Sequence, residues 1–471
     1  MRTLVWFRRD LRLTDNQALY HAAKESKEGV VGLYLATPEQ WKLHDDANCK
    51  VGFWIRNVRL LSDSLAALNI PLLIVECNKF DEAARLVART AKDNECQSVF
   101  VNREYELNEL NRDAAAEQAC AAVGIDFRRF HDRIIVPPRE ISTKDGRFYS
   151  VFTPYKKVWN TKALDYCDPL PRPRKQPEIA IKPSVVPEQL GPYQSHDRLE
   201  SLWPAGEREA KKRLKQFGKV ILDYNDARDM PSLAGTSSLS PYLAAGVISP
   251  RQCFAAALTH NKGKIEGPNE GPKIWISELT WRDFYSHVMV GFPRVSKHQP
   301  FKLKTEAVPW RDDADDFAAW TEGRTGFPIV DAGMRQLNQT GWMHNRLRMV
   351  TAMFLTKNLL IDWRRGEQYF MEKLIDGDLA ANNGGWQWSA STGTDAVPYF
   401  RIFSPFSQSK RFDCEGEFIK TMCPELEPVP AKSLHDPDKL SKAINQLGVD
   451  YPEYVVNYKH SRQRALAAFK T

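Results

Sequence analysis

The strongest constraint on the fold is an alternation of short apolar runs with helical stretches over the first 135 residues. Stretches such as 51–68 and 82–94 repeat apolar residues at helical spacing. Between them lie five runs rich in β-branched or aromatic residues: Thr3–Phe7, Val30–Leu35, Leu72–Glu76, Ser98–Asn102 and Asp126–Phe130. This order is typical of an α/β domain built on a doubly wound parallel sheet.

The rest of the chain follows another pattern. Seven prolines lie between Pro169 and Pro192, which favours extended backbone that cannot build a core. Beyond about residue 200, strand patterns give way to helical segments bounded by Gly or Pro: Glu207–Phe217, Pro250–Thr259, Gly271–Met289, Pro328–Gln339 and Asn345–Leu360. We therefore predict an α/β domain at 1–135, a Pro-rich interdomain linker at 136–203 and an all-α domain at 204–471.

Composition narrows the class of protein without naming a function. The 471 residues are 42% hydrophobic and 27% charged, which excludes disordered and collagen-like chains. Arginines end the first apolar run after five residues, so we expect no signal peptide and no membrane span, and a cytoplasmic location. The eight cysteines lack metal-ligand spacing, which predicts no metal site. A net charge of +7 permits a nucleic-acid partner but does not require one.

The turn after the first predicted strand argues against one enzyme class. It reads Phe7-Arg-Arg-Asp10 in place of the Gly-rich turn that holds a nicotinamide dinucleotide. A hydride-transferring dehydrogenase is therefore disfavoured.

The segment Ile375–Trp388 points to a ligand site. It gathers two aspartates, two asparagines, three glycines and two tryptophans in fourteen residues. Glycines allow a flat ligand to approach the backbone, and the acids and amides match the donors and acceptors of a heterocycle. A structural turn would explain the glycines only.

A hydroxyl-rich loop, Gly235–Ser240, precedes a predicted helix and could hold a phosphate there. Taken alone, Ser240 before Pro241 is better explained as an ordinary helix cap. Two helical pairs, Glu278 with Trp281 and Asn345 with Met349, could line a cavity. For either pair by itself, the better interpretation is that Trp281 and Met349 are core residues and that Glu278 is a solvated neighbour.

Five motifs in this order resemble the photolyase/cryptochrome family, and within it the bacterial class I cyclobutane-dimer photolyases with a folate antenna. The motifs span nearly the whole chain: Trp6–Leu13, Gly235–Ser240, Glu278–Tyr285, Thr340–Met349 and Asp376–Trp388. The resemblance implies light-driven cleavage of cyclobutane pyrimidine dimers in UV-damaged DNA.

By this resemblance, FAD binds in the helical domain and works in its reduced form, FADH⁻. Arg348 would pair with Asp376, and the amide of Asn382 would face the flavin, where an amide can accept a hydrogen bond without adding a charge. The implied FAD-binding residues are Tyr224, Thr236, Ser237, Ser238, Leu239, Ser240, Arg348, Asp376, Gly377, Asp378 and Asn382.

The resemblance also implies that an excited electron passes to a flipped-out dimer and then returns. Glu278 would hydrogen-bond the dimer, Asn345 would give a polar contact, and Trp281 and Trp388 would form an aromatic wedge. The implied DNA-binding set is Arg228, Glu278, Trp281, Asn345, Arg346, Met349, Trp388 and Arg401, with Lys410 and Arg411 nearby. For each arginine, a surface or salt-bridge role is about as well supported.

Two further sets come from the resemblance alone. Trp310, Trp363 and Trp386 match a relay that carries electrons from the surface to the flavin. His44, Asn108, Glu109 and Lys297 match residues that bind a methenyltetrahydrofolate antenna. Ser296 stands before Lys297 where relatives can have cysteine, which makes antenna binding less secure than FAD binding.

Two alternatives stay open at this point. A cryptochrome-type blue-light photoreceptor would use the same FAD without repair, but Asn382 and the set of Glu278, Trp281 and Trp388 favour repair. A flavoprotein oxidoreductase is disfavoured because the nicotinamide fingerprint is absent. Since a DNA lesion must reach an open face, we also expect a monomer.

Overall fold

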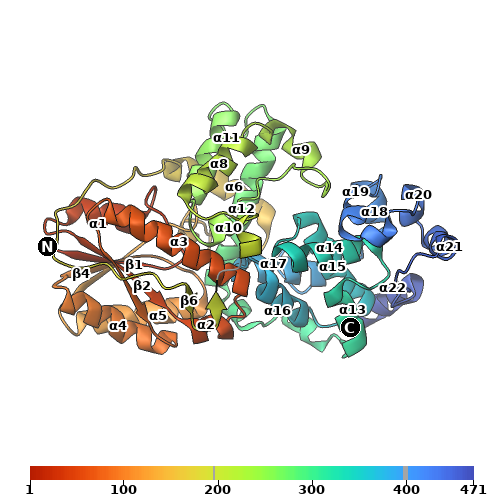
Figure 1. Cartoon of the computed structure of the whole chain (residues 1–471), viewed down its shortest axis with the longest axis horizontal. Coiled ribbons are helices and arrows are strands. Elements are labelled where there is room, and N and C mark those ends of the chain that lie inside the picture. The colour runs from red at the N-terminus through yellow and green to blue at the C-terminus, as the bar shows by residue number, and fades with distance from the viewer. Residues whose placement is uncertain (195–196, 396–400, 471) are drawn as a thin grey trace. The chain divides into compact units, whose positions relative to one another are not determined.

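The computed structural model describes residues 1–194, 197–395 and 401–470 (Figure 1). These residues form two compact units. The first unit comprises Met1–Leu222, Ser237–Ser296 and Ile375–Ala380, and the second comprises Asp223–Thr236, Lys297–Leu374 and Ala381–Thr471. Each unit is described by itself.

The first unit is built on a five-stranded parallel sheet in the order β3-β2-β1-β4-β5. The strands are β1 (Thr3–Phe7), β2 (Val30–Ala36), β3 (Leu72–Glu76), β4 (Ser98–Asn102) and β5 (Asp126–Phe130). The predicted strands are thus confirmed, with β2 one residue longer than expected. The strand order reverses direction between β1 and β4, and in open α/β sheets ligands bind at the carboxyl ends of the strands beside such a reversal.

Helices cover both faces of this sheet (Figure 1). α1 (Gln17–Glu25) and α3 (Asn48–Ala66) lie on one face, and α4 (Phe80–Asp93) and α5 (Leu107–Ala121) on the other. Val87 and Ala91 of α4 and Ala116 of α5 pack on the apolar strand residues. The doubly wound α/β class is confirmed.

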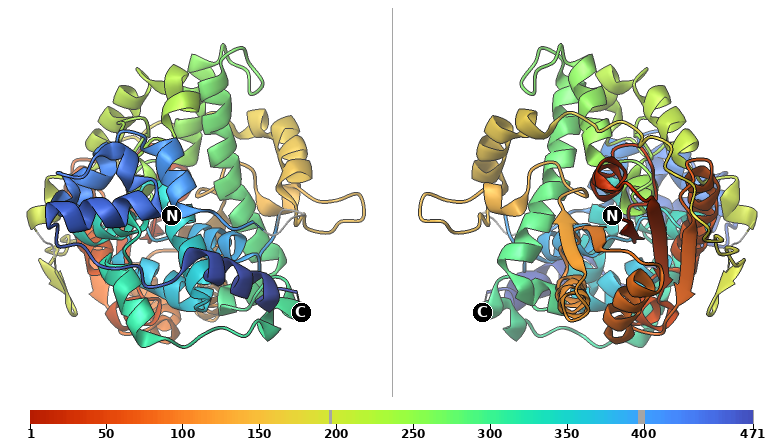
Figure 2. Two further views of the ribbon diagram at one scale, coloured as in Figure 1. Left: turned by 90° about the vertical axis from the view of Figure 1, so that its right-hand side faces the viewer. Right: turned by 90° about the vertical axis from the view of Figure 1, so that its left-hand side faces the viewer.

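The remaining elements of the first unit are short, apart from α6, α8, α11 and α12. They are α2 (Pro38–Leu43), η1 (Pro138–Glu140), α6 (Phe152–Lys162), η2 (Ala163–Tyr166), β6 (Gln189–Leu190), β7 (Tyr193–Gln194), α7 (Asp197–Glu200), α8 (Glu207–Phe217), η3 (Ile221–Asp223), α10 (Ser240–Ala244), α11 (Pro250–His260), α12 (Glu270–Gly291) and η4 (Pro293–Lys297). Figure 2 shows α12 in green, with α6 in gold beside it.

The predicted linker at 136–203 contains more structure than its prolines suggest. α6 buries Phe152, Tyr155 and Trp159, and a two-stranded antiparallel hairpin joins β6 to β7. The Pro-rich composition therefore describes only the stretch before β6, where neither helix nor strand forms. The predicted domain boundaries stay a prediction.

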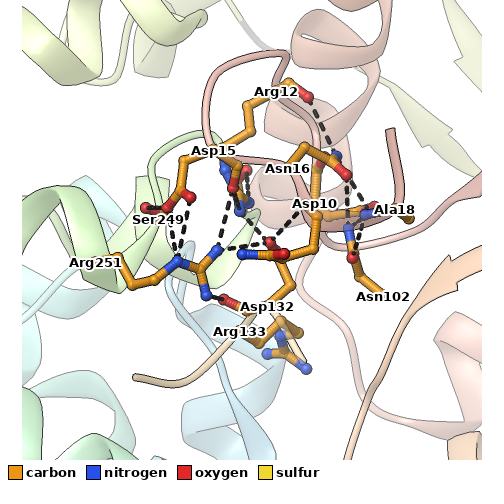
Figure 3. A network of polar contacts seen from close by, with 12 residues as sticks. Asp10, Arg12, Asp15, Asn16, Ala18, Asn102, Asp132, Arg133, Ser249 and Arg251 are labelled. Carbon is orange, nitrogen blue, oxygen red and sulfur yellow. Dashed lines mark hydrogen bonds and ion pairs between the residues drawn. The ribbon is translucent and has the colours of Figure 1, made fainter. Parts of the chain in front are cut away.

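A buried polar network ties α11 to the loops that follow β1 and β5 (Figure 3). We call Arg12, Asp15, Asp132, Ser249 and Arg251 the Arg251 network. The guanidinium of Arg251 lies 3.0 Å from carboxylate oxygens of both Asp15 and Asp132, and Arg12 lies 2.6 Å from Asp132. Ser249 donates to Asp15 and also caps α11. Two arginines thus compensate two aspartates inside the protein.

The second unit is helical, as predicted, and its apolar core contains Trp320, Trp363 and Trp386. Its elements are α9 (Tyr224–Ala227), η5 (Leu303–Ala307), α13 (Ala314–Glu322), α14 (Pro328–Thr340), α15 (Asn345–Met353), η6 (Phe354–Leu359), α16 (Trp363–Lys373), α17 (Leu379–Ala390, begun in the first unit), α18 (Pro405–Phe412), α19 (Glu417–Met422), η7 (Pro424–Leu426), α20 (Ala431–Leu434), α21 (Pro437–Leu447) and α22 (Tyr458–Ala468).

One predicted helix is divided in the structure. The stretch Asn345–Leu360 consists of α15, then a π-helical turn, η6, and it ends at Leu360 with φ of +57°. A π-turn closes i→i+5 hydrogen bonds where an α-helix closes i→i+4 bonds. No Gly or Pro marks it in the sequence, which is why periodicity missed it. None of the helices within the described ranges has the length and apolar character needed to cross a membrane.

Candidate active site

The predicted site residues are distributed over both units. In the first unit, α12 carries Glu278 and Trp281 almost one turn apart. The indole of Trp281 stacks flat on Phe152 of α6, with ring centroids 3.6 Å apart and planes 7° apart. Both Glu278 and Trp281 are half-buried. Phe152 therefore fixes the plane of an aromatic side chain that solvent can still reach.

The opposite side of α12 is anchored by Asp283. Its carboxylate accepts hydrogen bonds from the backbone N–H of Ile135 and the indole N–H of Trp159, both at 2.9 Å. Burial raises the pKa of Asp283 to about 6. These bonds hold the helix that presents Glu278 and Trp281 in a fixed rotation.

The loop Asp376–Asp378, which is predicted to contact the flavin and is called the flavin loop below, also belongs to the first unit. Asp376 is buried, and Asp378 accepts an ion pair of 2.8 Å from Nη2 of Arg133. Arg133 follows β5 and is itself buried. The loop is thus held by a residue from the α/β part of the chain.

The hydroxyl loop continues from Thr236 in the second unit to Ser237, Ser238, Leu239 and Ser240 in the first. Ser238 has φ of +50°, and the N–H of Leu239 donates to the Ser237 hydroxyl at 3.4 Å. Leu239 is the N-cap of α10 and Ser240 is its first residue, so the cap lies one residue before the serine that the sequence suggested. The three serine side chains are half-buried.

Three of the four predicted antenna residues meet at one place in the first unit. Nε2 of His44 lies 3.0 Å from Nδ2 of Asn108 and 2.9 Å from Nε2 of Gln40, and Nδ1 of His44 lies 3.8 Å from Glu109. Burial lowers the pKa of His44, so its ring is neutral at pH 7. Lys297 is exposed and belongs to the second unit.

Glu109 is part of a larger charged group at the carboxyl ends of β1 and β4, which we call the β1–β4 ion cluster. Arg112 binds Glu104 at 2.8 Å and Asp113 at 2.6 Å. Three further arginines, Arg8, Arg9 and Arg133, contact the same acids or their neighbours. The cluster comprises Arg8, Arg9, Glu104, Glu106, Glu109, Arg112, Asp113, Arg133 and Asp378.

The carboxyl groups of this cluster have unlike acidities. Burial raises the pKa of Glu104, but Arg9 and Arg112 outweigh it and hold this pKa well below its usual range. Burial and repulsion from Glu106 raise the pKa of Glu109 to about 7. Glu109 therefore exchanges a proton near neutral pH while Glu104 stays ionised.

In the second unit, α15 presents four predicted residues close together. Asn345 is exposed, and Arg346, Arg348 and Met349 are half-buried. Arg346 makes an ion pair of 2.8 Å with Asp229, which also lies 3.8 Å from Arg228. Two of the predicted phosphate-binding arginines therefore share one carboxylate.

The other half of the predicted flavin site is α17. Nδ2 of Asn382 donates to the backbone oxygen of Glu367 at 3.0 Å, and Nδ2 of Asn383 donates to Oε1 of Glu367 at 2.8 Å. Because Nδ2 of Asn382 is held in this way, its Oδ1 is the atom that can accept from a ligand. Tyr224, at the start of α9, is buried in the same unit.

The three predicted relay tryptophans belong to one core. Trp363 and Trp386 are buried, and Trp310 packs at the edge of the core and is half-buried. The ring centroids of Trp386 and Phe370 lie 4.9 Å apart, and those of Trp310 and Phe469 lie 5.6 Å apart. Exposure thus rises from Trp363 and Trp386 to Trp310.

The remaining predicted residues lie at the surface of the second unit. Trp388 of α17 is half-buried, and Arg401, Lys410 and Arg411 are exposed. Arg348 and Asp376 belong to different units, as do Glu109 and Lys297, so their joint action stays a prediction.

Two family models match this chain. A model described as DNA photolyase covers residues 3–175, and one described as the FAD binding domain of DNA photolyase covers residues 275–471. A deoxyribodipyrimidine photo-lyase of Vibrio cholerae is 46% identical over 99% of both chains. The chain belongs to the DNA photolyase family.

Other photolyase relatives agree over the full length. Deoxyribodipyrimidine photo-lyases of Salmonella typhimurium and Escherichia coli are each 44% identical over 99% of this chain and 98% of their own. Among solved structures, a bacterial class III photolyase from Agrobacterium tumefaciens matches with a TM-score of 0.84 and 34% identity, covering 99% of this chain and 97% of that one. A Synechocystis cryptochrome matches with a TM-score of 0.90 but 28% identity, covering 99% of both.

The residues present fit the FAD of a photolyase. Anionic phosphates suit the hydroxyls of Ser237, Ser238 and Ser240, and a heterocycle edge suits the carboxyl of Asp376 and the oriented amide of Asn382. In addition, Nε1 of Trp386 is buried and makes no hydrogen bond within the described part of the chain. This N–H could donate to an acceptor atom of a bound group.

Sequence reasoning missed the residues that hold the predicted site residues in place. Arg133 contacts Asp378 from 245 positions away, Phe152 stacks on Trp281, and Glu367 orients Asn382. No local pattern links such partners, because each pair is joined only by the tertiary fold. Only the proximity of Arg133 to a predicted strand end could have suggested a role.

Proposed function

We propose that this photolyase-family chain repairs cyclobutane pyrimidine dimers in UV-damaged DNA with the energy of light. The observation that carries the proposal is full-length identity of 44–46% with relatives named deoxyribodipyrimidine photo-lyase, against 28% with the Synechocystis cryptochrome. The set of Glu278, Trp281, Asn382 and Trp388 supports the same function.

Bound FAD, in its reduced form FADH⁻, would supply the light-excited electron that splits the flipped-out dimer and then returns. Asp376, Gly377, Asp378 and Asn382 would hold the ring side, and Thr236 to Ser240 the phosphates. Arg348 and Tyr224 would complete the site. Since Oδ1 of Asn382 can accept but not donate a proton, it favours a cofactor that keeps its own N–H.

The chain's own residues would prepare the dimer for this electron. Glu278 would hydrogen-bond the dimer and stabilise its added charge, with Asn345 and Met349 in contact with it. Trp281, held flat by Phe152, and Trp388 would replace the stacking that the flipped bases lose, at about 1–3 kcal/mol per base.

Arginines would position the DNA backbone through its phosphates. Arg401, exposed like Lys410 and Arg411, is suited to a flanking phosphate. Arg228 and Arg346 can also contribute, but phosphate must then compete with Asp229 for them. We therefore expect Arg401 to carry more of the salt-dependent affinity than Arg346.

Two accessory functions complete the proposal. Trp310, Trp363 and Trp386 would bring electrons inward from the half-buried end of the chain of indoles. His44, Asn108 and Glu109, with Lys297, would bind methenyltetrahydrofolate as an antenna. The carboxyl of Glu109 suits the N–H donors of a pterin, and a lysine suits a folate glutamate tail.

A cryptochrome-type photoreceptor is the alternative, and the TM-score of 0.90 with the Synechocystis cryptochrome favours it. The same cofactor would then signal without repair. Because both functions need FAD, flavin binding cannot distinguish them, and a repair assay can.

The experiment compares repair of a thymine dimer in a short oligonucleotide by photoreduced holoenzyme, in light and in darkness. We expect light-dependent repair in the wild type and a loss of about 10- to 100-fold in Glu278→Ala, because a hydrogen bond to the charged dimer, worth about 1.5–3 kcal/mol, disappears. Glu270→Ala, at the exposed start of the same helix, is the matched control and should repair normally. If flavin-loaded wild type repairs nothing in light, the photoreceptor alternative replaces the proposal.

A further inference from the structure

The β1–β4 ion cluster connects two places to which the proposed function assigns different cofactors. Glu109 lies at its antenna end and Asp378 at its flavin end. All nine members are nearly buried, with no side chain more than 15% exposed. Charges that are buried together interact strongly and are screened little by salt.

Two arginines make this connection continuous. Nη2 of Arg9 lies 2.9 Å from Glu106 and 3.8 Å from Glu109. Nη1 of Arg133 lies 3.4 Å from Oε1 of Glu106, the oxygen that Arg9 also contacts. Nη2 of Arg133 lies 2.8 Å from Asp378. A chain of adjacent charges therefore runs from Glu109 through Arg9, Glu106 and Arg133 to Asp378.

The five acids of the cluster are not held equally by its arginines. A further arginine, Arg282 of α12, acts on Asp378 at the flavin end. Glu109 is the acid held least closely, because its nearest arginine contact is 3.8 Å while each other acid has one of 2.9 Å or less. Glu109 is therefore the acid of the cluster that takes up a proton most easily.

The surroundings of Glu109 agree with this reading. Burial, Glu106 and Glu104 raise its pKa, Arg9 and Arg112 lower it, and the result is about 7. His44 faces it from the end of α2, and His44 is itself acted on by Asp46, which precedes α3, by Arg9 and by Lys50 of α3. Glu109 therefore changes its charge near neutral pH, whereas the ring of His44, whose pKa burial lowers, stays neutral there.

We propose that the β1–β4 ion cluster couples the antenna end to the flavin loop, with Arg133 as the positioning residue that passes the charge state of Glu109 to Asp378. This rests on the proposed function for the roles of the two ends. When Glu109 is neutral, Arg9 turns fully to Glu104 and Glu106. The attraction of those two acids for Arg133 then becomes weaker. The ion pair between Arg133 and Asp378 becomes stronger as a result.

The coupling predicts a direction. Because a neutral Glu109 strengthens the Arg133–Asp378 pair, the flavin loop should hold FAD more tightly below pH 7 than above it. Thermodynamic reciprocity then requires that bound FAD favour the neutral form of Glu109. A ligand that donates hydrogen bonds to the Glu109 carboxylate would act in the opposite direction.

The test measures the rate at which full-length holoenzyme releases FAD, followed by flavin fluorescence between pH 5.5 and 8.5. We expect the release rate to rise about fivefold as the pH is raised from 5.5 to 8.5, with a midpoint near pH 7. A change of about fivefold is at the low end of the usual coupling between two sites. Glu109→Gln should release FAD slowly at every pH, because it mimics the neutral acid. Glu117→Gln is the control. Glu117 lies on α5, as Glu109 does, but its side chain is half-exposed and pairs with Arg129 of β5. This variant should keep the pH step of the wild type.

A second variant isolates the path. Arg133→Gln/Glu106→Gln removes one charge of each sign, and we expect it to bind FAD but to lose the pH step. A step that persists in this variant or in Glu109→Gln, or a wild type without any step, would overturn the coupling. Light-driven repair is measured on the same samples. Repair without a pH step in FAD release would contradict only the coupling. A pH step without repair would contradict only the proposed repair function.

Discussion

The interiors of the two units differ in the kind of side chain that they bury. The first unit buries ions at the carboxyl ends of its strands, in the Arg251 network and the β1–β4 ion cluster. The core of the second unit is apolar and aromatic, with Trp320, Trp363, Trp386 and Phe370 in contact. Ion pairs need exact partners, whereas an apolar core needs only close packing.

This difference suits what each region has to position. The loops that follow parallel strands have no regular hydrogen-bond partners, so Asp15, Arg133 and Asp378 hold them with directed charge pairs. The electron relay proposed for Trp310, Trp363 and Trp386 would need little polar reorganisation around the indoles, which an apolar core provides. The first unit is therefore expected to fail when one partner is lost, and the second when its packing is disturbed.

The largest expected effect comes from breaking the Arg251 network. Arg251→Met leaves Asp15 buried without its ion pair, which should cost about 3–5 kcal/mol in free energy of unfolding. Arg89→Met removes an exposed i,i+4 pair with Asp93 and should stay within about 1 kcal/mol of wild type. Urea unfolding measures both, and equal losses would contradict the assignment of the network as a buried support.

A smaller loss is expected from overpacking the aromatic core. A Cβ at Gly366 would lie 2.2 Å from the Trp386 ring, so Gly366→Ala should cost about 1–3 kcal/mol despite the better helix propensity of alanine. Trp386→Phe in the same chain removes the two ring atoms at 2.2 and 2.5 Å and leaves the Leu355 methyl group at 2.6 Å. If the double variant is not more stable than the sum of the single changes predicts, the contact is not the cause.

The smallest effect concerns a buried histidine in the second unit. Burial lowers the pKa of His344 to about 4, below the ordinary 6.5. Between these values the unfolded chain binds a proton that the folded chain does not, so stability falls as pH falls from 6.5 to 4. One such proton accounts for at most about 1.4 kcal/mol per pH unit.

His344→Asn tests this slope, because asparagine can still cap α15 as His344 does. Urea unfolding free energies at several pH values should fall less steeply for the variant than for the wild type. An unchanged slope would assign the effect to His131 and His287, whose pKa values burial also lowers to about 4.

The sheet was predictable because its strands are short apolar runs with turn residues at both ends. β1, β3, β4 and β5 have the predicted bounds, and α8 matches exactly Glu207–Phe217. The π-turn after α15 and the hairpin at 189–194 were not predictable, since neither breaks the periodicity that the sequence displays.

The candidate site was predictable only in part. Motif resemblance named Asp378, Glu109 and Trp281, but not the residues that fix them in space. Arg133 and Phe152 act across more than 120 positions of sequence, and charge pairing at such separation leaves no local pattern. The Arg251 network was missed for the same reason, because its members come from three separate loops or helix starts.

The central claim is that light drives repair without net consumption of electrons. The most direct measurement counts the thymine dimers that are split per electron supplied, with photoreduced enzyme under continuous near-UV or blue light and a limiting amount of reductant. We expect many dimers to be split for each electron in light, and none in darkness. One dimer or fewer per electron, or equal repair in the dark, would contradict it.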